Sequence, residues 1–131
     1  MMVLIDTTVW IDFFSGRSYQ HVKALEDLIV KRQDICLCGI ILTEVLQGIR
    51  QDSEFNRTRD LFANLIFLPM QYQTFLRSAE IYRTLRQKGI TVRKPMDCMI
   101  ASVAIKNDMP LLHNDKDFVP IEKYFGLKRY L

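Results

Sequence analysis

The sequence has little of what marks several large classes of protein. None of its apolar runs approaches the roughly 18–20 residues that a membrane-spanning helix needs, so we expect no membrane partner. Its first residues have neither a basic segment nor a small-residue cleavage site, which predicts a cytoplasmic location. The 5 glycines stand apart from one another, and the only histidines are His21 and His113. A glycine-rich phosphate loop is therefore excluded, and a Ser-His-Asp triad is not expected.

Cysteine is scarce as well, with 3 in the chain: Cys36, Cys38 and Cys98. No histidine stands near the first two, so a zinc site would lack its ligands. If their segment is a strand, both side chains point to the same face, which favours packing. Cys98 lies in an apolar stretch. We expect three buried core thiols.

Neither sign of charge dominates, because 18 Lys and Arg face 15 Asp and Glu, a net charge of +3. Hydrophobic residues make up 49% of the chain and no linker interrupts it, so we expect one domain over residues 1–131 with a sizeable core. The mild positive charge does not by itself indicate a nucleic-acid partner. Carboxylates gathered around a cation would leave a more basic surface, which suits a polyanionic substrate.

The hydrophobic pattern predicts strands that alternate with helices. We expect strands at residues 2–5, 35–37, 66–69 and 110–113, with a further candidate at 127–130. We expect helices at residues 8–14, 19–31, 39–50, 53–64, 72–88 and 96–106, with Thr8 and Ser53 as N-caps. This alternation implies right-handed crossovers. The predicted fold is α/β, with helices on both faces of a mainly parallel sheet of four or five strands.

Four acidic residues stand at informative positions: two directly follow expected strands, and two lie in apolar stretches where burying an unpaired charge costs free energy. Asp6 directly follows the first expected strand and Asp115 follows the fourth, at the sheet edge where α/β proteins bind ligands. Glu44 and Asp97 are embedded in apolar stretches, and burying either carboxylate unpaired would cost several kcal/mol. Each acid could instead be an N-cap, an ion-pair member or a solvated position. Asp97, just after Pro95, is the strongest N-cap candidate.

Acids gathered at one sheet edge would repel one another and raise their own pKa values. A divalent cation removes that conflict, and Mg²⁺ or Mn²⁺ prefers such oxygen ligands. We therefore predict a metal site formed by Asp6, Asp97 and Asp115, with Glu44 in the same catalytic centre. His113 could also be a ligand, although a histidine that closes a strand is more often structural. A calcium-binding EF-hand loop is excluded at residues 115–117, because its glycine and distant glutamate are missing.

Four segments together resemble one known family. They are residues 4–12 (LIDTTVWID), 42–45 (LTEV) with the following Gly48, 94–101 (KPMDCMIA) and 113–118 (HNDKDF). In order and spacing they resemble PIN-domain proteins, and in particular the VapC-type toxins of toxin–antitoxin pairs. Each motif alone is weak, but the four are jointly specific and span the chain from Leu4 to Phe118.

The resemblance implies an α/β/α sandwich and a Mg²⁺- or Mn²⁺-dependent endoribonuclease, a toxin that cleaves tRNA or rRNA and is inhibited by a cognate antitoxin. The positions that match the family's acidic quartet are Asp6, Glu44, Asp97 and Asp115. Thr8 matches the hydroxyl residue that supports the first acid, and Asp117 is an accessory acid. The chain departs from many relatives at His113, where they carry Thr or Ser, which leaves the hydrogen bonding around Asp115 open.

Other functions fit less well. A phosphatase of the haloacid dehalogenase type needs a second Asp where this chain has Thr8, and a receiver domain needs its Asp after a middle strand. A non-catalytic RNA- or partner-binding PIN module remains an alternative, although such a module would tolerate loss of acids that are all present here. Arg93 and Lys94, just before Asp97, either hold RNA phosphates beside the metal or form a solvated charge pair. Surplus apolar residues on the 8–14 helix (Trp10, Phe13, Phe14) and the 72–88 helix either complete the core or form a homodimer seam and an antitoxin groove.

Overall fold

Four parallel strands form the centre of the protein. The computed structural model describes residues 1–131 and contains β1 (Met2–Ile5), β2 (Asp34–Cys38), β3 (Ile66–Leu68) and β4 (Leu111–Leu112). They form one sheet in the order β3-β2-β1-β4, and every neighbouring pair is parallel. Residues 3–5 of β1 are fully buried, which explains why this strand is an unbroken apolar run rather than an alternating one.

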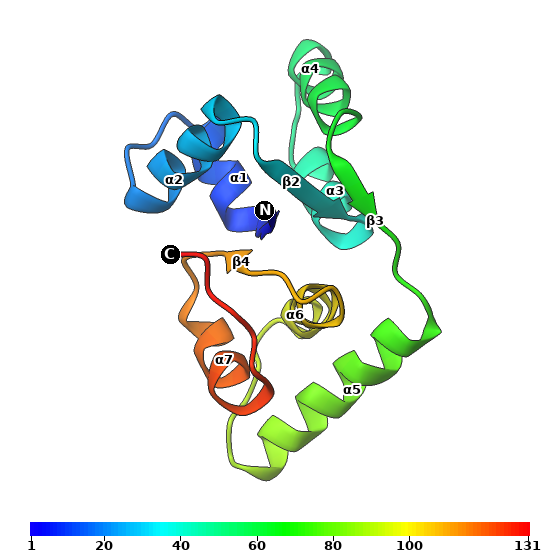
Figure 1. The fold of residues 1–131 in the computed structure, drawn as a ribbon. Coiled ribbons are helices and arrows are strands. Elements are labelled where there is room, and N and C mark those ends of the chain that lie inside the picture. The colour runs from blue at the N-terminus through cyan, green and yellow to red at the C-terminus, as the bar shows by residue number, and fades with distance from the viewer.

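Helices cover both faces of the sheet. They are α1 (Thr7–Phe14), α2 (Gln20–Val30), α3 (Gly39–Gln47), α4 (Asp52–Phe62), α5 (Tyr72–Gln87), α6 (Pro95–Lys106), the short 3-10 helix η1 (Lys116–Phe118) and α7 (Val119–Phe125). In Figure 1, α1 and α2 lie on one side of β1 and β4, whereas α5, α6 and α7 lie on the other. The expected three-layer α/β/α architecture is therefore confirmed.

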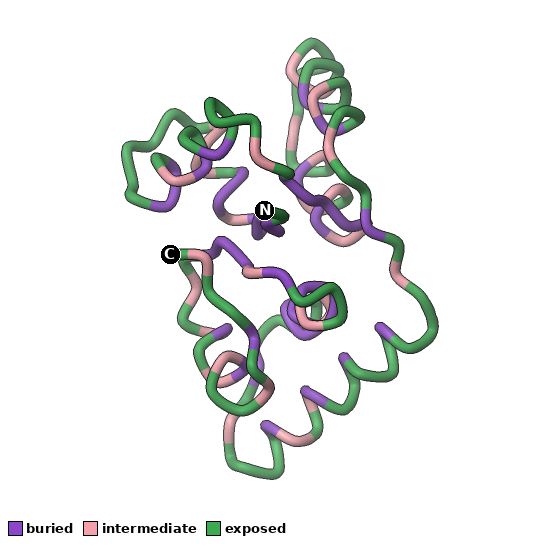
Figure 2. The backbone as a smooth tube through the Cα atoms, in the orientation of Figure 1, coloured by how far each residue is buried: buried purple, intermediate pink, exposed green.

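The core lies between these layers and contains 29 buried hydrophobic residues. The three cysteines are among them and are free thiols, as expected. Helix α5 shows how the outer helices join the core: its buried residues Thr74, Ser78, Ile81 and Leu85 recur at helical spacing. In Figure 2 they form the intermittent purple stripe along the inner side of an otherwise green helix. None of the helices is both long and apolar enough to span a membrane.

The strand order fixes where a ligand can bind. From β1 the chain moves to β2 and β3 on one side, and it then returns to place β4 on the other side of β1. The direction of winding therefore reverses between β1 and β4, and α/β sheets bind ligands outside the carboxyl ends of the strands at such a point. Asp6 follows β1 and Asp115 follows β4, so both acids flank this reversal.

Three details differ from the expectations. The N-cap of α1 is Asp6 rather than Thr8, and the N-cap position of α4 is held by Gln51 rather than Ser53, so each N-cap lies two residues earlier than expected. The candidate fifth strand is a single parallel bridge between Leu111 and Arg129, because β4 is too short to support more pairing. Helices η1 and α7 were not expected. Their signals are the Asp115 cap, Pro120 in the first turn of α7, and Gly126 at its end with a φ of 70°.

Candidate metal and catalytic site

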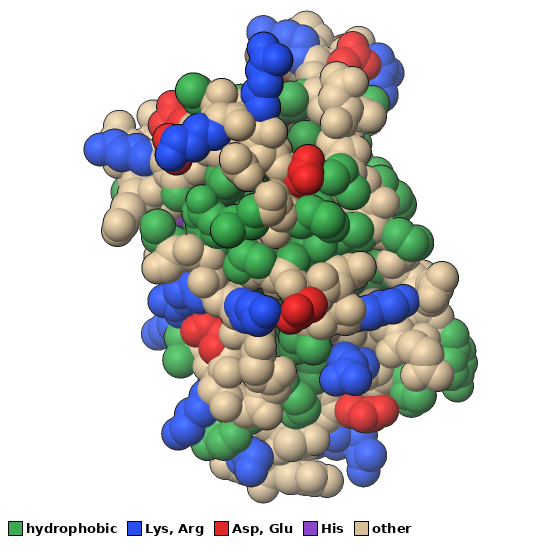
Figure 3. Space-filling model, in the orientation of Figure 1, with side chains coloured by type: hydrophobic (Ala, Val, Ile, Leu, Met, Phe, Trp, Pro, Cys, Tyr) green, Lys and Arg blue, Asp and Glu red, His purple; other side chains and the backbone are tan.

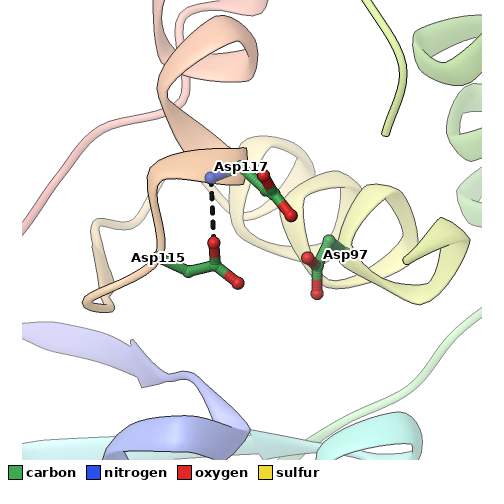
Figure 4. A group of neighbouring side chains, drawn as sticks. All are labelled: Asp97, Asp115 and Asp117. Carbon is green, nitrogen blue, oxygen red and sulfur yellow. Dashed lines mark hydrogen bonds between the residues drawn. The ribbon is translucent and has the colours of Figure 1, made fainter. Parts of the chain in front are cut away.

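Three carboxylates converge beyond the carboxyl end of β4. Asp97 comes from α6, whereas Asp115 and Asp117 come from the loop after β4 and from η1. Each offers one oxygen to a group whose members all lie within 4.8 Å of one another. Figure 4 shows the three side chains facing a common space between α6 and η1. This spacing is compatible with shared coordination of one cation.

Asp97 does not cap its helix, contrary to the simplest interpretation of its position. Lys94 is the N-cap and Pro95 is the first helical residue, a position that suits proline because no partner is needed there for an N–H. Asp97 is therefore the third helical residue, and its carboxylate remains free of capping contacts. It is 6% exposed, and its Oδ2 atom is buried without any hydrogen-bond partner.

The surroundings of Asp97 disfavour its charge. The pKa of this carboxyl is raised to about 7: burial is the largest cause, the nearby Lys94 acts to lower the pKa, and the charges of Asp6, Asp115 and Glu44 act to raise it. All four acids of the predicted quartet therefore lie close enough to interact. Without a cation, Asp97 holds a proton over part of the neutral range.

Asp115 is held far more firmly. Its Oδ1 accepts the backbone N–H of Asp117 at 2.9 Å, and its Oδ2 accepts a hydrogen bond from Lys94 Nζ at 2.9 Å. Partial burial alone would raise the pKa of Asp115, but these donors and the charges of Lys94 and Arg93 outweigh it and lower the pKa. Two neighbouring carboxyls thus have pKa values shifted in opposite directions.

His113 supports the backbone of Asp115. Its Nδ1 atom accepts the Asp115 N–H at 3.1 Å, so the ring proton lies on Nε2, which donates to Glu122 at 2.7 Å. The ring also packs against Phe118. Because both ring nitrogens are engaged, His113 is a structural residue here and is not placed as a metal ligand.

Asp6 forms the other side of the site and is 2% exposed. Its Oδ2 accepts the Thr8 hydroxyl at 2.6 Å and the Thr8 backbone N–H at 3.3 Å. Burial raises the pKa of Asp6, and these hydrogen bonds partly oppose that rise. Thr8 thus makes the contact that the family resemblance implied, although Asp6 itself is not within the 4.8 Å group.

Thr7 is a site residue whose role the sequence did not reveal. Its hydroxyl donates to Glu44 Oε1 at 2.6 Å and so links the start of α1 to α3. Consecutive helical residues project about 100° apart, so Thr7 and Thr8 can serve two different acids. A pair of hydroxyl residues directly after a strand-ending acid is the signal that could have indicated this role. Glu44 is only half-buried, less than its apolar sequence context predicted.

The two basic residues expected to bind phosphate are paired with acids. Arg93 Nε donates to Asp117 Oδ2 at 3.0 Å. Lys94 Nζ lies 4.0 Å from Asp97 Oδ2 in addition to its contact with Asp115. Both basic side chains therefore neutralise the triad in the absence of a metal.

These residues fit a divalent cation. Buried Asp97 Oδ2 has no hydrogen-bond donor, and one oxygen from each of Asp97, Asp115 and Asp117 lies within 4.8 Å of the other two. Hard oxygen ligands of this kind suit Mg²⁺ or Mn²⁺ rather than zinc or copper. The arrangement can therefore hold a cation at the sheet edge and present it to a polyanion.

Comparison with known proteins agrees with this geometry. The PIN domain family matches residues 3–124. The chain is 33% identical over 129 residues to ribonuclease VapC11 of Mycobacterium tuberculosis, an alignment that covers 97% of this chain and 96% of the relative. Among solved structures, VapBC2 from Rickettsia felis matches with a TM-score of 0.77 at 21% identity, over 98% of this chain and 97% of that one. A toxin–antitoxin complex from Klebsiella pneumoniae matches with a TM-score of 0.72 at 25% identity, over 91% and 92%. The chain therefore belongs to the PIN-domain family and is a relative of its VapC proteins.

Proposed function

We propose that this protein is a metal-dependent endoribonuclease, the toxin of a type II toxin–antitoxin pair, which cleaves tRNA or rRNA in the cytoplasm. The observation that carries the proposal is the buried, unpartnered Asp97 Oδ2 within a group of three carboxylates. The names of the relatives support it: one is called a ribonuclease, and one is described as part of a toxin–antitoxin complex.

The cation of the proposal is Mg²⁺ or Mn²⁺. We assign Asp97, Asp115 and Asp6 as its ligands and Asp117 as an accessory acid. When bound, such a cation neutralises charge that develops on the phosphodiester and lowers the pKa of a coordinated water. The protein's contribution is to hold these carboxylates in place and oriented toward the cation.

The remaining residues orient water and substrate. Glu44 is anchored through Oε1 to Thr7 and makes no other hydrogen bond, so its second oxygen can accept a proton of the attacking water. Thr8 fixes the rotamer of Asp6 in the same way. Once a cation neutralises the carboxylates, Lys94 can donate to phosphate oxygens instead of to Asp115. Arg93 can donate to phosphate through its free Nη groups while its Nε atom stays with Asp117.

The cognate antitoxin has a suitable docking groove in this proposal. A cavity of about 440 Å³ is lined by Ile11 and Phe14 of α1 and by Val45 of α3, and it reaches Glu44. An apolar floor that ends at a catalytic acid suits an amphipathic helix carrying a Lys or Arg. Pairing of that basic group with Glu44 would silence the site.

The expected homodimer needs a different surface from the one suggested by the aromatic residues of α1. Trp10 is fully buried and stacks with Phe14, so it completes the core and is not available for a seam. Helix α5 instead exposes Tyr72, Phe75 and Leu76, which are 77%, 45% and 42% exposed. Apolar side chains also gather across the middle of the face drawn in Figure 3, with Lys and Arg around them. Light scattering that shows only monomer up to high micromolar concentration would contradict the dimer.

The decisive experiment for the nuclease is incubation of the purified protein with bulk cellular RNA, with and without Mg²⁺, followed by mapping of the cut ends. We expect cleavage at a small number of sites, only with the cation, and none with the Asp97→Asn variant. Cleavage that persists in EDTA would contradict metal dependence. Binding without cleavage would favour the non-catalytic PIN module.

The toxin role is tested separately. Expression in a host without an antitoxin should arrest growth, and Asp97→Asn should relieve the arrest. Harmless expression of protein that cleaves RNA in vitro would contradict the toxin role while leaving the nuclease intact.

A further inference from the structure

Next to the acidic triad lies a second feature, a polar cavity of about 540 Å³. Three basic side chains line it, Arg93, Lys116 and Arg129, and Val119 is the only apolar residue in its wall. Asp115 is the one acid in that wall, so the cavity borders the proposed metal site directly. Two of these cations are paired with acids outside the wall, Arg93 with Asp117 and Arg129 with Glu122, so Lys116 and the exposed ends of the two guanidinium groups are what favour an anionic ligand.

The two arginines are held in the same unusual way. Arg93 donates through Nε to Asp117 at 3.0 Å, and Arg129 donates through Nε to Glu122 at 2.9 Å. Neither guanidinium makes another side-chain hydrogen bond, so the terminal Nη groups of both remain unpartnered. A guanidinium fixed at Nε keeps the planar pair of donors that binds phosphate oxygens bidentately. Both arginines are therefore oriented in advance of any ligand.

Two further groups in the same wall are unpaired. Lys116 is exposed and forms no ion pair, although it stands between Asp115 and Asp117 in the sequence. Asn114 is exposed and its amide makes no hydrogen bond. A solvated lysine is ordinary on its own. Here its free ammonium lines the same cavity as two fixed arginines.

The cavity continues toward α2. A smaller space of about 180 Å³ shares His113, Asn114 and Arg129 with it and adds Gln20 and His21. The two spaces therefore adjoin each other, and we refer to them together as the polar track. Each is far too small to admit a double helix, and the larger falls within the roughly 300–1,000 Å³ that hold single small ligands.

From these observations we infer that the track is a subsite for single-stranded RNA, in which Arg93, Lys116 and Arg129 bind the phosphate next to the one that is cleaved. The subsite rests on the proposed nuclease function and adds to it a second phosphate-binding position beside the cut. Asn114 and Gln20 supply amide groups that can contact the adjoining base.

The test is direct binding of a short fluorescent oligouridylate to the metal-free full-length chain, followed by anisotropy over a range of salt concentrations. Lys116→Gln should weaken binding several-fold and reduce the slope of log affinity against log salt by about 0.7, the value for one lost phosphate contact on a single strand. Arg129→Lys keeps the charge but loses the planar donor pair, so it should weaken binding with little change in slope. Lys88→Gln is the matched control, because Lys88 contacts only the ring of Tyr124, and it should change neither quantity.

The outcomes separate this inference from the nuclease proposal. Equal binding by Lys116→Gln and Lys88→Gln, or equal affinity for a fully paired RNA duplex, would overturn the subsite even if the wild type cleaves RNA. Selective loss of binding in Lys116→Gln would support the subsite even if the metal-loaded wild type failed to cleave.

Discussion

The two sides of the acidic site are held by opposite chemistry. On the side of β1 and α3, neutral hydroxyls bind the acids: Thr8 donates to Asp6 and Thr7 donates to Glu44, both at 2.6 Å. On the side of α6 and η1, cations bind them: Lys94 pairs with Asp115 at 2.9 Å and Arg93 with Asp117 at 3.0 Å.

This difference has a physical consequence. A hydroxyl orients a carboxylate without supplying an opposite charge, so on the first side no ion pair has to break before a cation binds. An ammonium cancels charge, so the second side is stable without metal but must exchange partners when metal or RNA binds. Asp97 lies between the two sides and has a fully buried oxygen that neither side satisfies.

Among these predictions, removing the Asp97 carboxylate, which lies between the two sides, should have the largest effect, and it should act on the rate of RNA cleavage. Asp97→Asn keeps the size of the side chain but loses the charge that a cation requires, so RNA cleavage should fall by at least about 1,000-fold. Circular dichroism should show an intact fold, because the new amide relieves repulsion. Activity within tenfold of the wild type would make Asp97 a structural residue. Asp60→Asn, on an exposed part of α4, is the matched control.

Two conservative substitutions separate the contributions of the two hydroxyl residues, Thr8 and Thr7. Thr8→Val removes the donor from deeply buried Asp6, and we expect cation affinity to fall by roughly 10–100-fold, as for other residues that orient metal ligands. Thr7→Val should reduce cleavage less, because half-buried Glu44 can be solvated instead. Titration calorimetry and cleavage rates measure the two effects, with Thr84→Val on α5 as control. A larger loss for Thr7→Val would reverse this ranking.

Substitution on the cationic side should raise metal affinity, whereas Thr8→Val on the hydroxyl side should lower it. The Lys94 ammonium occupies space beside the oxygens that a cation would bind, so Lys94→Gln should raise Mg²⁺ or Mn²⁺ affinity several-fold at low salt. The gain should shrink as salt screens the ammonium. Lys128→Gln removes a similar exposed pair, with Asp108 at 2.7 Å, and should leave metal affinity unchanged. Weaker metal binding in Lys94→Gln would mean that Lys94 orients Asp115 more than it competes for it.

Chain order made much of the site predictable. Asp6 and Asp115 directly follow apolar strands, and parallel strands end at the same edge, so their proximity followed from the alternation of strands and helices. The Pro95 signal for a helix start was equally local. It did not by itself reveal that Asp97 would be the third helical residue with a free carboxylate.

The contacts across the site could not be predicted, because they depend on how elements pack. Thr7 and Glu44 are 37 residues apart, and Lys94 and Asp115 are 21 apart. The Thr7–Glu44 contact forms only if α3 packs against the start of α1 in one particular position. The Lys94–Asp115 contact likewise requires one particular position of the loop after β4 against the start of α6. Trp10 illustrates the same limit: its apolar character was plain, but whether it filled the core or a seam depended on its contact with Phe62, at 4.9 Å between ring centroids.

The smallest expected effect is on the pH dependence of stability without metal. The pKa of Asp97 is raised from 3.8 to about 7 in the folded protein, so between these values the native state holds a proton that the unfolded chain has lost. The free energy of unfolding should therefore fall as pH rises through this range and level off above it, by about 1–2 kcal/mol from this residue. Asp115, whose pKa is lowered, acts in the opposite direction but only in more acidic solution.

Urea unfolding in EDTA at pH 5 and pH 8 measures the change. The difference between the wild type and Asp97→Asn isolates this carboxyl from every other group that the two proteins share. A wild type whose stability rises relative to Asp97→Asn between pH 5 and pH 8 would mean that the Lys94 ammonium, and not burial, governs Asp97.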